Sequence, residues 1–241
     1  MSKLRLDEAL VARGLYPSRA RARDAVMRGT VLVNGQPARK PAQNVTGDDE
    51  LRVHDRARDY VSRAALKLIA ALNHFNIDVE GRRALDIGAS AGGFTQVLLE
   101  RDASQVIAIE VGHGQMMLDD ERIDLREGIN ARDLTRDDVP EDVSLVVCDV
   151  SFIPLHIALG PALELAAEGA HLVALIKPQF EVGRAALGKG GIVRDEALQQ
   201  QACADVAEFV RRAGWHVLGV IPSPIEGGDG NKEFLLAAFK G

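Results

Sequence analysis

The stretch DIGASAGGFT, residues 86–95, decides the fold of this chain. The short apolar run 84–87 leads into it, and a helical pattern follows, so the stretch forms a glycine-rich turn between a predicted strand and a predicted helix. Glycines at such a turn let the backbone approach a ligand closely, and open α/β sheets bind ligands at the carboxyl ends of their strands. The stretch therefore predicts an α/β domain with a ligand site beside residues 86–95.

An acidic residue stands where a nucleoside cofactor needs one. Glu110 closes the next predicted strand, twenty-two residues after Gly88, and its carboxylate is suited to accept hydrogen bonds from the two hydroxyls of a ribose. The order G-A-S-A-G-G over residues 88–93 lacks the G-x-G-x-x-G spacing of the dinucleotide fingerprint. The pattern therefore indicates a nucleoside cofactor and disfavours NAD.

Strand-like and helix-like segments alternate from Val61 to the end of the chain. The first four strand candidates are apolar runs without clean alternation, which is typical of strands covered on both faces. The last two lie close enough in sequence to form an antiparallel hairpin at the sheet edge. The predicted strands are residues 84–87, 106–109, 144–147, 172–176, 217–221 and 234–238. We expect an α/β, Rossmann-like fold with a mostly parallel sheet and an antiparallel edge hairpin.

The first sixty residues differ from the rest in charge and pattern. Residues 1–40 hold nine Lys or Arg against three Asp or Glu, whereas residues 41–241 hold twenty against thirty-two, so the net charge of -6 conceals a basic end on an acidic body. Two short helices, the second capped by Ser18, and a hairpin turn at Asn34-Gly35 predict a small α+β module. We expect this module and its linker, at residues 54–60, to span residues 1–60, with a second domain over residues 61–241.

The basic module has a recognisable sequence. Residues 5–41, RLDEALVARGLYPSRARARDAVMRGTVLVNGQPARKP, resemble the S4 RNA-binding domain through most of their length. The resemblance implies binding of structured RNA by shape and backbone, where each neutralised phosphate releases counterions. The candidate RNA contacts are Arg5, Arg19, Arg21, Arg23, Arg28, Arg39 and Lys40.

The glycine-rich stretch and Glu110 together resemble class I S-adenosylmethionine-dependent methyltransferases. The resemblance implies that the loop holds the amino acid end of the cofactor and that the acidic strand end holds the ribose. It also places Asp133 where such enzymes often contact the adenine. The candidate cofactor residues are Asp86, Gly88, Ser90, Gly92, Gly93, Phe94, Glu110 and Asp133.

The residues around Asp149 limit which chemical groups the enzyme could methylate. Amino-group methylation typically uses Asn or Asp followed by Pro-Pro and an aromatic residue, whereas residues 149–152 read Asp-Val-Ser-Phe. Carbon-5 methylation of pyrimidines uses a cysteine nucleophile, but Cys148 directly precedes Asp149 on a strand, so the two side chains point to opposite faces. Both chemistries are therefore disfavoured.

Four ionisable residues occupy strand or helix positions that can converge: Lys67, Asp149, Lys177 and Glu233. Their order resembles the Lys-Asp-Lys-Glu constellation of ribose 2'-O-methyltransferases of the FtsJ group. A hydroxyl has to lose its proton as the methyl group arrives, so a base must lie within hydrogen-bond reach. A lysine is a base only as the neutral amine, which burial and a neighbouring cation favour. We therefore expect Lys177 to act as the base beside Lys67, with Asp149 and Glu233 orienting the lysines and the hydroxyl.

Six local motifs, in order along the chain, resemble the TlyA-type family, also labelled hemolysin A-like. The resemblance implies an S-adenosylmethionine-dependent enzyme that methylates the ribose 2'-oxygen of cytidine in ribosomal RNA, above all 23S and also 16S rRNA. The chain departs from the family in having Ala91 for Thr, His113 for Tyr and Glu110 for Asp. The motifs are YVSRAALKL at 60–68, DIGASAGGFT at 86–95, VGHGQ at 111–115, DVSFI at 149–153, IKPQFE at 176–181 and GNKEF at 230–234.

Composition sets further limits. No run approaches the roughly 18 apolar residues of a membrane span, and the first residues lack the apolar segment of a signal peptide, so we expect a cytoplasmic protein. The two cysteines, Cys148 and Cys203, cannot build a disulfide framework or a four-cysteine zinc site, and we expect no metal. Ribosomal RNA or a ribosomal subunit is the expected partner. The oligomeric state stays open, and a monomer is compatible with the sequence.

Three other functions compete with this interpretation. The hemolysin label suggests a membrane-active protein, although no strongly amphipathic apolar helix is evident. An RNA-binding protein without catalysis is a second alternative, which the intact tetrad opposes. A pseudouridine synthase is a third, because S4-like modules precede those enzymes too, but their G-R-L-D signature is missing.

Overall fold

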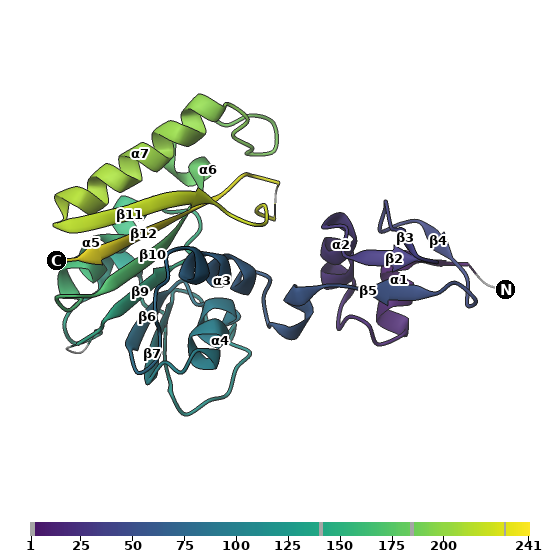
Figure 1. Ribbon diagram of the computed structural model, residues 1–241, viewed down its shortest axis with the longest axis horizontal. Helices are drawn as coiled ribbons and strands as arrows, with labels where there is room; N and C mark the ends of the chain where they lie inside the picture. Colours follow the sequence, from purple (N-terminus) through teal and green to yellow (C-terminus); the bar gives the residue numbers. More distant parts are fainter. Residues whose placement is uncertain (1–2, 140–141, 184–185, 229) are drawn as a thin grey trace. The chain divides into compact units, whose positions relative to one another are not determined.

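A computed structural model describes residues 3–139, 142–183, 186–228 and 230–241. The chain divides into two compact units, Met1–Asp59 and Tyr60–Gly241, which we call unit 1 and unit 2 (Figure 1).

Unit 1 packs two helices against short strands. Side chains from both helices and from the strands share one apolar core that includes Leu6, Leu10 and Val31. The Ser18 side chain accepts a hydrogen bond from the Arg21 backbone N–H and thereby caps the second helix, as the sequence predicts. The helices are α1 (Leu6–Ala12) and α2 (Arg19–Met27); the strands are β1 (Leu4–Arg5), which pairs with β4 (Asn44–Val45), and the sheet β3-β2-β5 (Gln36–Pro37, Val31–Val33, Leu51–Val53).

The segment expected to be a linker is ordered within unit 1. Residues 56–59 form a 3₁₀ helix, η1 (Arg56–Asp59). The Asp55 carboxylate accepts hydrogen bonds from the Tyr16 hydroxyl at 2.6 Å and from the Arg28 guanidinium at 2.7 and 2.9 Å. Burial by itself raises the pKa of Asp55, but the bonds from Arg28 and Tyr16 outweigh it, so the pKa lies below its usual value. This buried network fastens the segment to α2.

Unit 2 is a seven-stranded sheet in the order β11-β12-β10-β9-β6-β7-β8. Neighbouring strands are parallel from β8 to β10, whereas β12 is antiparallel to both β10 and β11. The predicted α/β fold with an antiparallel edge hairpin is confirmed. The strands are β6 (Arg83–Ile87), β7 (Gln105–Glu110), β8 (Ile123–Glu127), β9 (Leu145–Cys148), β10 (His171–Ile176), β11 (Trp215–Pro222) and β12 (Phe234–Lys240).

Helices cover both faces of this sheet (Figure 1). On β6, Leu85 and Ile87 point into the core under α5 and α7, whereas Ala84 lies in the core under α3 and α4. Cys148 lies in the α5–α7 core and is fully buried, which agrees with the expectation that it faces away from Asp149. The helices are α3 (Ala65–His74), α4 (Gly93–Glu100), α5 (Leu155–Leu165), α6 (Pro178–Glu181) and α7 (Glu196–Arg212), with a 3₁₀ helix η2 (Ala131–Asp133).

The edge strand β8 is absent from the strands that the sequence predicts. It reads Ile-Asp-Leu-Arg-Glu, with three charged residues among five, and Asp124 and Arg126 form an ion pair at 2.8 Å. The strand forms because Ile123–Glu127 pairs in register with β7. Its position matters for the site, because the segment that follows β8 lines the main cavity.

Candidate active site

The functional candidates of unit 2 gather at the carboxyl ends of the parallel strands. Glu110 ends β7, Gly88 follows β6, Asp149 follows β9 and Lys177 follows β10, and these four strands are parallel neighbours. Ile176 pairs with Phe234 on the antiparallel strand β12, so the register continues to Glu233 beside Lys177. The topology thus brings together residues that are far apart in the sequence.

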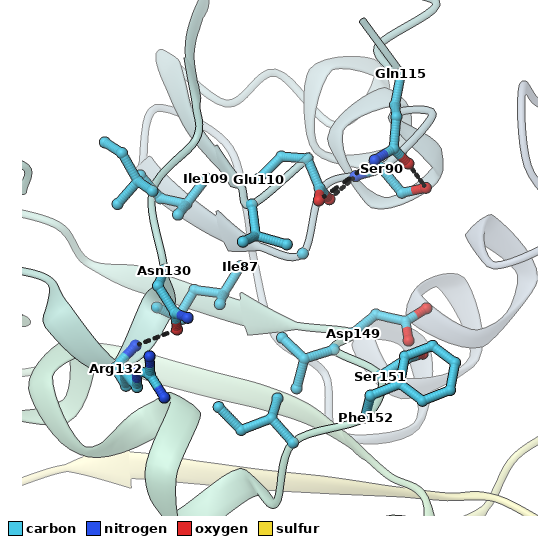
Figure 2. A pocket seen from close by; sticks show the side chains of 16 residues that line it. Ile87, Ser90, Ile109, Glu110, Gln115, Asn130, Arg132, Asp149, Ser151 and Phe152 are labelled. Atoms are coloured by element: carbon cyan, nitrogen blue, oxygen red, sulfur yellow. Dashed lines mark hydrogen bonds between the residues drawn. The ribbon is translucent and has the colours of Figure 1, made fainter. Parts of the chain in front are cut away.

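A cavity of about 560 Å³ opens at these strand ends. Figure 2 shows Glu110, Ser90 and Gln115 grouped on one side of it and Asp149, Ser151 and Phe152 on another. Its remaining wall comes from residues 129–132, after β8, together with apolar side chains at the strand ends. A cavity of this size with polar groups at defined points is typical of a small-molecule site.

The Glu110 carboxylate is held by backbone amides. Its Oε2 accepts a hydrogen bond from the Ser90 N–H at 2.9 Å, and its Oε1 accepts one from the Gly112 N–H at 2.8 Å. Ser90 has φ +47°, a left-handed conformation that is uncommon for a residue other than glycine. The Ser90 hydroxyl donates to Gln115 Oε1 at 3.1 Å. These bonds fix the carboxylate while lone pairs remain for a ligand.

A smaller cavity of about 170 Å³ lies against the glycine-rich loop. Gly93 and Phe94 line it, and Gly88, Ser90, Asp149 and Ser151 line both cavities. Gly88 has φ +82°, and a Cβ atom there would lie 2.7 Å from the Asp149 carbonyl oxygen. Only glycine therefore lets the loop lie this close to Asp149. Gly92 does not line either cavity, but a Cβ atom there would lie 2.6 Å from the Met116 sulfur.

Besides Gly92, two predicted cofactor residues, Asp86 and Asp133, lie outside both cavity walls. Asp86 is completely buried under the loop; its Oδ2 accepts a hydrogen bond from the Thr95 hydroxyl at 2.6 Å, and burial raises its pKa to about 7. Asp133 is exposed on η2 and lies 3.5 Å from the Arg132 guanidinium. Asn130, Ala131 and Arg132 line the cavity in its place.

The four predicted catalytic residues form two lysine–carboxylate pairs. Lys67 Nζ lies 2.6 Å from Glu233 Oε2, with both side chains below 10% exposed. Lys177 Nζ lies 2.6 Å from Asp149 Oδ1. That second contact is an ion pair without hydrogen-bond geometry, and the hydrogen bond from Lys177 Nζ goes to Ser151 Oγ at 2.9 Å. The structure therefore pairs each lysine with a carboxylate.

Several site residues were not singled out from the sequence, although Ser151, Phe152 and Gln115 lie inside quoted motifs. Phe152, in DVSFI, is 91% exposed, has φ +67° and lies 5.1 Å from the Phe180 ring centroid. Gln115, in VGHGQ, lines the main cavity. Asn130 and Ala131 lie in none of the quoted motifs. Their position at the cavity depends on β8, which the sequence did not predict.

The basic residues of unit 1 fall into two groups. Arg5 pairs with Asp7 at 3.0 Å, Arg19 pairs with Glu8 at 3.1 Å, and Arg21 donates to the Ala57 carbonyl at 2.8 Å. The Arg28 side chain is 15% exposed and is bound by Asp24 and Asp55, so its guanidinium is not presented to a ligand. Of the seven predicted RNA contacts, Arg23, Arg39 and Lys40 are exposed and have no side-chain hydrogen bond or ion pair among the described residues.

Within residues 3–139, 142–183, 186–228 and 230–241, none of the helices has the length and apolar character that a membrane span requires. No group of three or more His, Cys, Asp or Glu side chains in the same ranges is arranged to hold a metal ion.

The sequence matches two known families. Residues 60–240 match the FtsJ-like methyltransferases, and residues 4–51 match the S4 domain. A protein of Mycobacterium tuberculosis named 16S/23S rRNA (cytidine-2'-O)-methyltransferase TlyA is 44% identical over 97% of this chain and 89% of its own length. A protein of Campylobacter jejuni named 23S rRNA (cytidine-2'-O)-methyltransferase TlyA is 33% identical over 95% of this chain and 97% of its own. A solved structure from Streptococcus thermophilus, titled as a hemolysin, is 38% identical with a TM-score of 0.76 and covers 100% of this chain and 89% of that chain.

Proposed function

This chain belongs to the FtsJ-like methyltransferase family, and we propose that it transfers a methyl group from S-adenosylmethionine to a ribose 2'-oxygen of ribosomal RNA. The resemblance to the TlyA-type family is confirmed by relatives that match almost the whole chain. The observation that carries the proposal is the position of Lys177, which lines the smaller cavity together with the glycine-rich loop and lies 2.6 Å from Asp149.

The cavities suit S-adenosylmethionine. The amide-bound Glu110 carboxylate presents its free lone pairs at the main cavity, as a ribose diol requires. The apolar wall near Ile129 and Ala131 suits an adenine ring, and the narrow cavity at Gly88 and Gly93 suits an amino acid chain. The carboxylates of Glu110 and Asp149 favour a ligand that carries a positive sulfonium.

Lys177 is the proposed base. Bound S-adenosylmethionine would supply an electrophilic methyl group. The Lys177 ammonium, which pairs with Asp149, first releases a proton to solvent; the resulting amine then accepts the proton of the ribose hydroxyl as the new oxygen–carbon bond forms and the sulfur–carbon bond breaks. Lys67 and Glu233 hold each other in place at 2.6 Å, and the pairing of Ile176 with Phe234 brings Glu233 toward Lys177, which supports a role for this pair in orienting the hydroxyl.

The substrate is proposed from the relatives and from unit 1. Both named TlyA proteins act on cytidine in 23S rRNA, and the M. tuberculosis protein is also named for 16S rRNA. An S4 domain, with Arg23, Arg39 and Lys40 exposed on it, fits an RNA backbone. The exposed ring of Phe152, at the cavity rim, can stack on an unpaired base. We propose 23S rRNA as the principal substrate.

The proposal is tested by methyl transfer from labelled S-adenosylmethionine to unmodified ribosomal subunits. Lys177→Ala should abolish transfer while the dissociation constant for S-adenosylmethionine stays within about threefold, because the base acts only on the acceptor. Arg212→Ala, which removes a 78% exposed charge on α7, is the control and should keep full activity. Retained activity in Lys177→Ala would show that another group is the base.

A further inference from the structure

We infer that Ser151 is a positioning residue for Lys177, and that the Ser151 hydroxyl rather than the Asp149 carboxylate sets the direction of the lysine amine. The inference rests on the proposed function, because it concerns the base of that reaction. It starts from a difference between the two contacts of Lys177 Nζ.

The two neighbours of Lys177 Nζ differ in kind. Ser151 Oγ accepts a hydrogen bond from Nζ at 2.9 Å. Asp149 Oδ1 is closer, at 2.6 Å, but lies off the hydrogen-bond direction, and this buried oxygen has no hydrogen-bond partner among the residues with described positions. Coulombic attraction depends on distance and hardly on direction, whereas a hydrogen bond fixes an angle. Asp149 therefore supplies charge and Ser151 supplies orientation.

The segment that carries Ser151 is anchored at both ends. The Asp149 N–H donates to the Ile87 carbonyl at 3.0 Å, which ties the start of the segment to β6. The Leu155 N–H donates to Glu181 Oε1 at 2.9 Å, which ties its end to α6. Between these bonds, Phe152 has φ +67° and its ring meets that of Phe180 on α6. Ser151 is thus held against the same short helix that follows Lys177, so its hydroxyl is preorganised.

The direction of the amine matters for proton transfer. A neutral lysine amine has two N–H bonds and one lone pair, and only the lone pair can accept the proton of a hydroxyl. One N–H bond directed at Ser151 restricts rotation about the Cε–Nζ bond and so restricts where the lone pair points. Ser151 lines both cavities, so its hydroxyl lies where the methyl donor and the acceptor have to meet. Misdirection of a catalytic group by a small amount costs on the order of 100-fold in rate.

An isosteric pair of variants isolates the hydroxyl in the full-length protein. Ser151→Thr keeps the hydroxyl group and Ser151→Val replaces it with a methyl group of the same shape; residue 151 is exposed, so both should fold. We expect Ser151→Val to lower kcat about 10- to 100-fold with the dissociation constant for S-adenosylmethionine unchanged within about twofold. Ser151→Thr should stay within about threefold of the wild-type kcat, and equal losses in the two variants would overturn the inference.

A second readout does not depend on activity. Acetylation of surface amines with a water-soluble reagent, followed by peptide mass spectrometry, reports how free the Lys177 amine is. We expect faster acetylation of Lys177 in Ser151→Val than in Ser151→Thr or wild type, and equal rates in all three would overturn the inference. Wild-type protein that transfers no methyl groups would refute the proposed function, whereas the acetylation rates still decide the role of Ser151.

Discussion

At the scale of single residues, the Glu110 carboxylate combines burial with two amide donors, Ser90 and Gly112. Glu110→Gln removes the charge and turns an amide NH₂ toward a backbone N–H. We expect the dissociation constant for S-adenosylmethionine to rise about 10- to 100-fold, the equivalent of about 1.5 to 3 kcal/mol for a hydrogen bond to a charged group, as measured by calorimetry. Asp133→Asn is the control, because the structure places Asp133 outside the cavity; weakened binding there would restore Asp133 to the site.

Asp86 makes unit 2 sensitive to pH. Burial raises its pKa to about 7, so between about pH 4 and pH 7 the folded protein holds a proton that the unfolded chain has lost. The contribution of Asp86 to the free energy of unfolding therefore falls as the pH rises through that window and is constant above it. Asp86→Asn cannot ionise, so its advantage over wild type in the free energy of urea unfolding should grow from pH 5 to pH 8, by up to about 2.7 kcal/mol.

The control for this prediction is Asp119→Asn, at an exposed position. Its difference from wild type should be the same at pH 5 and pH 8. If the stability difference between Asp86→Asn and wild type is the same at pH 5 and pH 8, Asp86 ionises in the folded protein as it does in water.

The sequence predicts the identities of the site residues better than their partners. The strand order brings Asp149, Lys177 and Glu233 to the same end of the sheet, and Lys67 reaches Glu233 from α3. Which carboxylate each lysine meets depends on side-chain directions that no spacing encodes. Ser151 had no signal of its own, because its role depends on a contact with Lys177 across two strand ends.

At the scale of elements, the segment before α7 is tied to the hairpin that carries Glu233. Asn231 is 1% exposed; its Oδ1 accepts a hydrogen bond from the Val193 N–H at 3.0 Å, and its Nδ2 donates to the Gly191 carbonyl at 3.2 Å. Asn231→Ala leaves these buried backbone groups unpaired. We expect a loss of about 1 to 3 kcal/mol in the free energy of unfolding and faster hydrogen exchange of the Val193 amide.

Lys232→Ala gives the comparison for this prediction. Lys232 lies next to Asn231 but pairs with Glu196 at the surface, at 3.0 Å with both side chains more than half exposed. Its removal should change the stability by less than about 1 kcal/mol. Equal effects of the two variants would contradict the role given to Asn231.

In unit 1, Asp55 links α2 to the chain that leads toward unit 2. Asp55→Asn leaves the Arg28 guanidinium without its buried partner, and we expect thermal unfolding of unit 1 to show a loss of about 2 to 4 kcal/mol. Glu50→Gln breaks an exposed ion pair with Arg52 and should cost less than about 1 kcal/mol. A small effect of Asp55→Asn would mean that Tyr16 and Arg28 find other partners.

Strands with a strong hydrophobic pattern can be predicted from the sequence. β8 lacks such a pattern and was not predicted. The buried strands β6, β7, β9 and β10 read as apolar runs because helices cover both faces. β8 lies at the sheet edge and carries charged side chains at Asp124, Arg126 and Glu127, so it lacks the apolar run that marks the other strands. The segment 54–60 has no hydrophobic periodicity for a different reason. The Asp55 carboxylate, which bonds to Arg28, holds it in place rather than a stripe of apolar side chains.

At the scale of the whole molecule, the basic charge belongs to unit 1, and we expect it to govern RNA affinity. Changing Arg23, Arg39 and Lys40 to Gln removes three exposed charges from the full-length protein. The slope of log affinity for ribosomal RNA against log salt should then fall by about 2 to 3. Arg211→Gln with Arg212→Gln, on α7 of unit 2, should leave the slope unchanged. An unchanged slope in the triple variant would place the RNA contacts elsewhere.

The most direct test of the proposed function identifies the atom that receives the methyl group. Unmodified ribosomal subunits are incubated with the protein and labelled S-adenosylmethionine, and the rRNA is digested to nucleosides for mass spectrometry. We predict label in 2'-O-methylcytidine of 23S rRNA, and none when Lys177→Ala replaces the wild type. Label on a base, or no label in rRNA, would contradict the proposal.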